Sequence, residues 1–236
     1  MEFCISTCCF GERYYNQTNR LINSFDNIKD TPEIFIITDS PNSIIKRKNV
    51  FVSHINLFNS KYEIYKEDYY NFDASVKRYA LLFSFQCGYN KVVLVDCDIT
   101  ANLNSFNNEN IMRLFKKNTI GGQVTYNFSE QVNSSSRLGK RFLEYEKEFG
   151  VEFDKSLLNT MPEDCIEFIS IDDWKKNSFI DVWNECIKIK DEKKLGNTPV
   201  GNIDEICFSA IYNRINVINN SDDGINILVP IHDKWY

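Results

Sequence analysis

The sequence predicts a single α/β domain, with a central, mostly parallel sheet flanked by helices. Runs rich in β-branched and other apolar residues over 3–9, 33–39 and 50–55 indicate strands, and a stretch with helical spacing separates the first two. A further apolar run, 91–96, directly follows another helical stretch. Strands that alternate with helices are typical of a parallel sheet.

The first helix is predicted from Tyr14, Leu21, Ile22 and Phe25, which recur at helical spacing after Gly11. The strand over 33–39 closes on the turn-forming pair Ser40 and Pro41. A second helix is predicted over 75–88 and should end at Gly88, because glycine readily adopts the left-handed conformation that ends many helices. Later helices are expected over 110–116, 137–149, 172–187 and 204–213, and later strands over 119–126, 166–171, 215–218 and 225–230.

Length and charge limit the classes of function. The 236 residues, 43% of them hydrophobic, suffice for one domain with a sizeable core, spanning 1–236. A formal charge of -6 argues against non-specific binding to nucleic acid. No run is long and apolar enough to predict a membrane span, and the opening segment lacks the cationic lead of a signal peptide.

The eight cysteines lie mostly inside apolar segments, where a free thiol behaves as a small hydrophobic group. No C-x-x-C pair occurs among them. We therefore expect reduced cysteines and a cytoplasmic protein.

Asp96 and Asp98 are the most informative residues in the chain, because they directly follow the apolar run KVVLV. Side chains two apart on an extended segment point the same way, so both carboxylates can meet one hard cation. Ligands of parallel sheets bind beyond the carboxyl ends of the strands, where these residues should lie. The alternative is that they only cap a strand end.

These features resemble the nucleotide-sugar glycosyltransferases of the GT-A fold, and most closely the glycogenin-like family and similar small viral or bacterial transferases. The resemblance lies in the D-x-D motif, in Tyr14 after the first strand, in Lys77 and Arg78 just ahead of GYNKVVLVDCD, and in the ending HDKWY. It implies transfer of a sugar from a nucleoside diphosphate, most simply UDP, to a hydroxyl acceptor such as a glycan.

The same resemblance assigns a metal site to Asp96, Asp98 and His232, and a phosphate contact to Lys234. Only Asp233 separates His232 from Lys234, a shorter run than in the family. Two carboxylates and an imidazole suit Mn²⁺, with Mg²⁺ as a substitute.

Positions that contact uridine and phosphate in this fold correspond to Thr7, Tyr14, Asp39 and Arg78, with Cys97 inside the D-x-D as a further candidate for donor binding. Each has a structural alternative. Tyr14 suits the core, Asp39 suits a turn, and Arg78 suits a solvated helix face.

Asp204 and Glu205 correspond to acidic residues near the donor sugar and acceptor, and are the candidate catalytic pair. Capping of the helix that they begin explains them equally well. The glycogenin-like ending favours a retaining reaction by analogy, whereas spacing alone does not separate retention from inversion.

Two other functions fit parts of the sequence. Residues 96–100 also match D-x-D-x-T, the motif of haloacid-dehalogenase-like phosphatases, in which the first aspartate is the nucleophile and the segment 221–224 would supply a late acidic pair. That motif normally opens its domain, whereas several elements precede it here. The second alternative is a domain that binds a nucleotide sugar without turning it over.

Overall fold

The computed structural model describes the chain over residues 2–55, 77–117, 120–122, 147, 166–172 and 228–230. The expected helices at 137–149 and 204–213 and the expected strand at 215–218 lie outside these residues, apart from Lys147. Residues 171 and 172 are helical, as expected for the start of the helix at Asp172.

Within the described residues, the largest feature is a mixed sheet of mostly parallel strands in the order β3-β2-β1-β4-β7-β6. The strands β3, β2, β1 and β4 run parallel, β7 is antiparallel to β4, and β6 is antiparallel to β7. The sheet comprises β1 (Cys4–Cys9), β2 (Ile34–Thr38), β3 (Val50–His54), β4 (Lys91–Val95), β6 (Ile120–Gly122) and β7 (Ile166–Ser170). The α/β fold class is thus confirmed.

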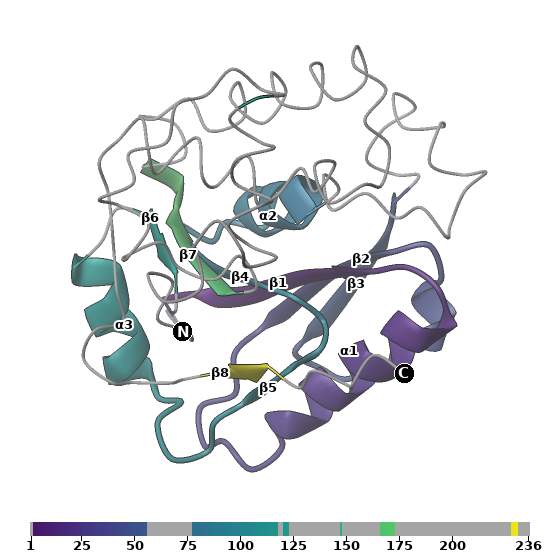
Figure 1. Ribbon diagram of the computed structural model, residues 1–236, viewed down its shortest axis with the longest axis horizontal. Helices are drawn as coiled ribbons and strands as arrows, with labels where there is room; N and C mark the ends of the chain where they lie inside the picture. Colours follow the sequence, from purple (N-terminus) through teal and green to yellow (C-terminus); the bar gives the residue numbers. More distant parts are fainter. Residues whose placement is uncertain are drawn as a thin grey trace.

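Helices cover both faces of the sheet, which explains why the central strands are mostly apolar (Figure 1). Helix α2 (Lys77–Gln86) lies on one face, whereas α1 (Glu12–Ser24) and α3 (Asn108–Lys117) share the core on the other. Every residue of β1 and β2 is buried, as two-sided cover requires. None of the described helices is both long enough and apolar enough to cross a membrane.

The end of α2 confirms the helix stop predicted at Gly88. This glycine has a φ of 96°, its N–H donates to Phe85 O at 3.0 Å, and the N–H of Tyr89 donates to Ser84 O at 3.2 Å. These two bonds satisfy carbonyl groups of the last turn in the Schellman arrangement. The turn sends the chain directly into β4.

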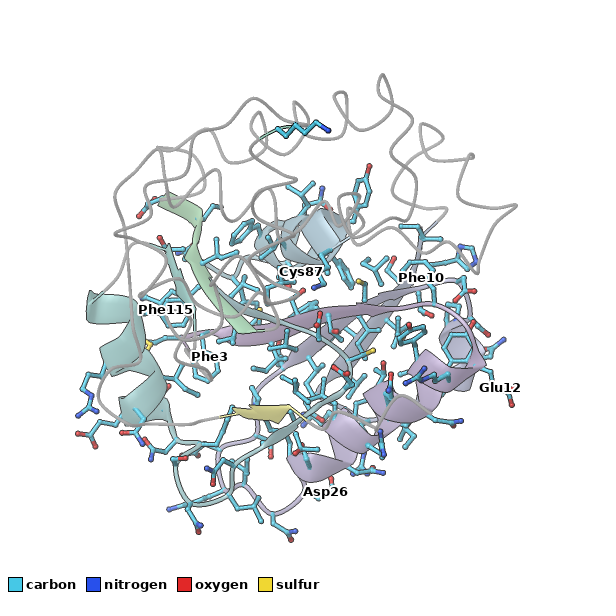
Figure 2. All side chains as sticks on the ribbon, in the orientation of Figure 1. Phe3, Phe10, Glu12, Asp26, Cys87 and Phe115 are labelled. Carbon is cyan, nitrogen blue, oxygen red and sulfur yellow. The ribbon has the colours of Figure 1, made fainter. Side chains whose placement is uncertain are left out.

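Aromatic side chains fill the core on the α1 face (Figure 2). The Phe3 and Phe115 rings lie with their centroids 6.5 Å apart, and Phe25 meets Phe106 edge to face at 5.0 Å. Edge-to-face packing of this kind is the favoured geometry for aromatic pairs. It fixes the segment after the D-x-D, which carries Phe106, against α1.

A small second sheet was not anticipated directly after the D-x-D. The strand β5 (Ile99–Ala101) pairs antiparallel with β8 (Leu228–Pro230), which lies within the strand expected at 225–230. Their register places Pro230 opposite Ile99. The strand β8 is therefore held beside the residue that follows Asp98.

Candidate functional site

The candidate site lies at the point in the sheet where the strand order reverses. From β1, the chain continues outward to β2 and β3 on one side, and only later adds β4 on the other side. The carboxyl ends of β1 and β4 are therefore neighbours at one edge of the sheet, but the chain does not pass directly from one strand to the other. Such a switch point is where open α/β sheets bind their ligands.

The D-x-D occupies the carboxyl end of β4 at this switch point. Leu94 pairs with Ser6 of β1, so Asp96 leaves the sheet about level with Cys8. Asp96 and Asp98 are partly exposed, whereas Cys97 between them is buried. Both carboxylates thus reach solvent from one short turn, as the alternation of the motif predicts.

Cys97 faces the interior, where its thiol donates to Gln17 Oε1 at 3.7 Å. Burial, followed by the negative charge of Asp96, raises the pKa of this thiol well above its ordinary value. The thiol is therefore neutral and serves as a buried anchor for the turn. A contact between Cys97 and the donor stays a prediction.

A buried lysine meets the first carboxylate of the motif. Lys77 Nζ lies 2.5 Å from Asp96 Oδ1, and the side chains are 7% and 34% exposed, respectively. The neighbouring Arg78, predicted above as a donor contact, also belongs to α2, but its side chain lies outside the described part of the structure. In a parallel sheet, the helix that precedes a strand begins near the carboxyl end of that strand. Lys77 is the first residue of α2, so its position in the sequence could have predicted that it lies near Asp96.

Tyr14 lies beside the same motif from the first turn of α1. Burial raises the pKa of its hydroxyl, and the neighbouring carboxylates of Asp98 and Asp96 raise it further, against the opposing effect of Arg13. Its ring is half-buried and packs against the core. Tyr14 therefore packs against the core, as its structural alternative expects. Its hydroxyl also lies close enough to Asp96 and Asp98 to be affected by their charges.

Thr7 lies inside the sheet rather than on its surface. It is fully buried in β1, opposite Ile36 of β2. Its hydroxyl has no hydrogen-bond partner among the described residues, and the same is true of Ser6. Direct contact between Thr7 and a donor stays a prediction.

Asp39 follows β2 and does not hold the adjacent turn. Ser40 N–H donates to Thr38 Oγ1 at 3.2 Å, and Ser43 N–H donates to Ser40 O at 3.0 Å. The Asp39 carboxylate instead accepts a hydrogen bond from the Tyr15 hydroxyl at 2.7 Å. Among the described residues, the carboxylate is linked to the turn only through Thr38, whose Oγ1 donates to Asp39 Oδ1 at 3.3 Å.

The remaining predicted site residues, His232, Lys234, Asp204 and Glu205, lie outside the described residues. Within the part that is described, no group of three or more His, Cys, Asp or Glu side chains is arranged to hold a metal ion. Asp96 and Asp98 supply two carboxylates, and a third ligand would have to come from elsewhere in the chain.

No protein-family model matches this chain, and no curated protein sequence matches it.

Proposed function

We propose that the protein is a metal-dependent glycosyltransferase of the GT-A type, which moves a sugar from a nucleoside diphosphate, most simply UDP, to a hydroxyl acceptor such as a glycan. The observation that carries the proposal is the pair of partly exposed carboxylates, Asp96 and Asp98, at the carboxyl end of a sheet strand beside the switch point.

The chemistry of these donors fits a hard divalent cation, Mn²⁺ or Mg²⁺, which prefers carboxylate oxygens. The bound cation would neutralise negative charge on the departing diphosphate. Asp96 and Asp98 would hold it, with His232 as the third ligand. The two carboxylates act on the same small region, because both raise the pKa of the Tyr14 hydroxyl.

The β5–β8 pairing supports the assignment of His232. Pro230 lies opposite Ile99, one residue from Asp98, and His232 follows two residues later in the sequence. A chain that leaves β8 at this point has only a short path to the carboxylates. The pairing of Pro230 with Ile99 is independent of the family resemblance.

The remaining roles follow from position. The Lys77 ammonium, held at Asp96, is a candidate partner for donor phosphate, together with Arg78 and Lys234. Tyr14 and Asp39 belong to the edge that would receive the nucleoside and the diphosphate, whereas Thr7 and Cys97 are buried behind it and would support that edge from the interior. Asp204 and Glu205 are proposed for the reacting centre.

The Lys77–Asp96 ion pair also favours one competing function. An aspartate that attacks a phosphoryl group needs a nearby cation to stabilise the charge on that group, and Lys77 could supply it. A phosphatase of the haloacid-dehalogenase type is therefore the second candidate.

A thermal-shift measurement with UDP separates the two candidates. We expect UDP with Mn²⁺ to raise the melting temperature, because a ligand at 100 times its Kd adds about 2.7 kcal/mol to stability. For a chain of this size, that corresponds to roughly 5–10 °C. UDP without metal should produce a much smaller shift.

Hydrolysis of p-nitrophenyl phosphate by the same sample provides the opposing result. If no nucleoside diphosphate raises the melting temperature with Mn²⁺ present, and the phosphate ester is hydrolysed, the glycosyltransferase proposal is wrong and the phosphatase is right.

The role of His232 is tested against the only other histidine of the chain, His54. His232→Ala should weaken binding of Mn²⁺ in the presence of UDP by at least about tenfold, because it removes one of three proposed ligands. His54→Ala removes an imidazole at the end of β3 and should leave that affinity unchanged. Calorimetric titration of Mn²⁺ measures both, and equal affinities in the two variants would remove His232 from the site.

A further inference from the structure

Two tyrosine–carboxylate hydrogen bonds flank β2, one at each end. The Tyr15 hydroxyl donates to Asp39 Oδ1 just after the strand, and the Tyr89 hydroxyl donates to Glu33 Oε2 just before it, both at 2.7 Å. The two bonds have the same chemistry and the same length. Only the first lies at the carboxyl edge of the sheet, where the candidate site is.

The Asp39 carboxylate is engaged on one oxygen only. Its Oδ1 accepts from Tyr15 at 2.7 Å and from Thr38 Oγ1 at 3.3 Å. Within the part of the chain that the structure describes, Oδ2 accepts no side-chain hydrogen bond, and the side chain is partly exposed. A carboxylate has acceptor sites on both oxygens, so Oδ2 can still accept a hydrogen bond from a ligand.

Tyr15 is itself held rigidly. Its N–H donates to Gly11 O at 3.1 Å in the first turn of α1, and its ring packs against the core. Burial and the bond to Asp39 raise the pKa of its hydroxyl to about 12, so the hydroxyl remains a donor at neutral pH. The position of Oδ1 is therefore fixed from α1.

We propose that Tyr15 is a positioning residue for the donor nucleoside: it holds Asp39 by Oδ1 so that Oδ2 is ready to accept a hydrogen bond from an O–H or N–H group of that nucleoside. An acidic residue after the second strand of a nucleotide-binding α/β sheet accepts such a bond from the ribose. The inference rests on the proposed function, because that function supplies the nucleoside.

The expected contribution of Tyr15 is modest and specific. Without the Tyr15 hydroxyl, the Asp39 side chain must be ordered when the ligand binds, and ordering one side chain lowers affinity by about 3- to 10-fold. Contacts to the diphosphate should not change, because the D-x-D lies after β4, two strands from β2. The effect should therefore be confined to ligands that contain a nucleoside.

The experiment compares Tyr15→Phe with the matched control Tyr89→Phe, which loses the same type of bond at the opposite edge. With Mn²⁺ present, calorimetry should show UDP affinity reduced about 3- to 10-fold in Tyr15→Phe and unchanged in Tyr89→Phe. Pyrophosphate, which lacks the nucleoside, should bind equally to both variants and to the wild type.

A second variant keeps the test independent of folding. Asp39→Asn should weaken UDP binding, and adding Tyr15→Phe to it should weaken binding no further, because Tyr15 acts through Asp39. The ligands 2′-deoxy-UDP and CDP then identify which nucleoside group donates a hydrogen bond to Asp39. If Asp39→Asn no longer weakens binding of 2′-deoxy-UDP, the ribose is the donor. If it no longer weakens binding of CDP, the base is the donor.

The outcomes distinguish this inference from the proposed function. If the wild type binds UDP and Tyr15→Phe binds it equally well, or if both phenylalanine variants weaken it alike, the positioning role is wrong while the proposed function stands. If the wild type binds no nucleoside diphosphate at all, both are wrong.

Discussion

Replacement of Asp98 by alanine should abolish Mn²⁺-dependent binding of UDP, with a loss of at least about 100-fold in affinity, and should remove sugar transfer with it. Asp98 is partly exposed in the turn after β4, outside the buried core. The free energy of unfolding should therefore fall by less than about 1 kcal/mol. Calorimetry of Mn²⁺ with UDP and urea unfolding measure the two quantities.

Asp30→Ala is the control for Asp98→Ala. Asp30 is exposed between α1 and β2, near the amino end of the parallel strands and so at the edge opposite the D-x-D. It removes the same charge from the protein without touching the proposed site. If Asp98→Ala retains the UDP and Mn²⁺ affinities of Asp30→Ala, the cation does not bind at the D-x-D.

The parallel half of the sheet could be predicted from the sequence because its signals are local. Each strand is a mostly apolar run, and turn-forming residues such as Gly88 or Ser40-Pro41 mark where an element ends. Asp96 and Asp98 lie at the carboxyl edge because they directly follow the strand Lys91–Val95 in the sequence. These are properties that neighbouring residues determine.

The antiparallel parts could not be predicted in the same way. The run at Ile166–Ser170 reads as a strand in either direction, and only its pairing with β4 determines that it is antiparallel. The strand β5 has three residues and gains its partner from Leu228–Pro230, far along the chain. Pairing over such separations depends on tertiary packing, which sequence periodicity does not encode.

Side-chain partners were the least predictable feature of the site. Arg78 and Lys77 are adjacent, and only the orientation of α2 determines which of them meets Asp96. Tyr14 and Tyr15 are adjacent as well, yet Tyr14 lies near the D-x-D and Tyr15 bonds to Asp39. Consecutive helix residues point about 100° apart, so a shift of one position changes the partner completely.

The Lys77–Asp96 ion pair should respond asymmetrically to the loss of each partner. Asp96→Ala leaves the ammonium of a side chain that is only 7% exposed without this carboxylate, and should cost about 3 kcal/mol of stability. Lys77→Met leaves a carboxylate that is 34% exposed and keeps its access to water, so it should cost about 1 kcal/mol or less. Urea unfolding of both variants checks the order, and a larger cost for Lys77→Met would contradict it.

The variant Lys77→Met also tests whether Asp96 holds the cation. In the protein without nucleotide, an incoming Mn²⁺ must approach a carboxylate that is already paired with an ammonium at 2.5 Å. Removing that positive charge should therefore raise Mn²⁺ affinity by at least about tenfold. Lys91→Met is the matched control, because Lys91 begins the strand that Asp96 follows and lies at the opposite edge of the sheet. If Mn²⁺ binds Lys77→Met no more tightly than Lys91→Met, Asp96 is not a ligand of the metal and the cation site must be built from Asp98 without it.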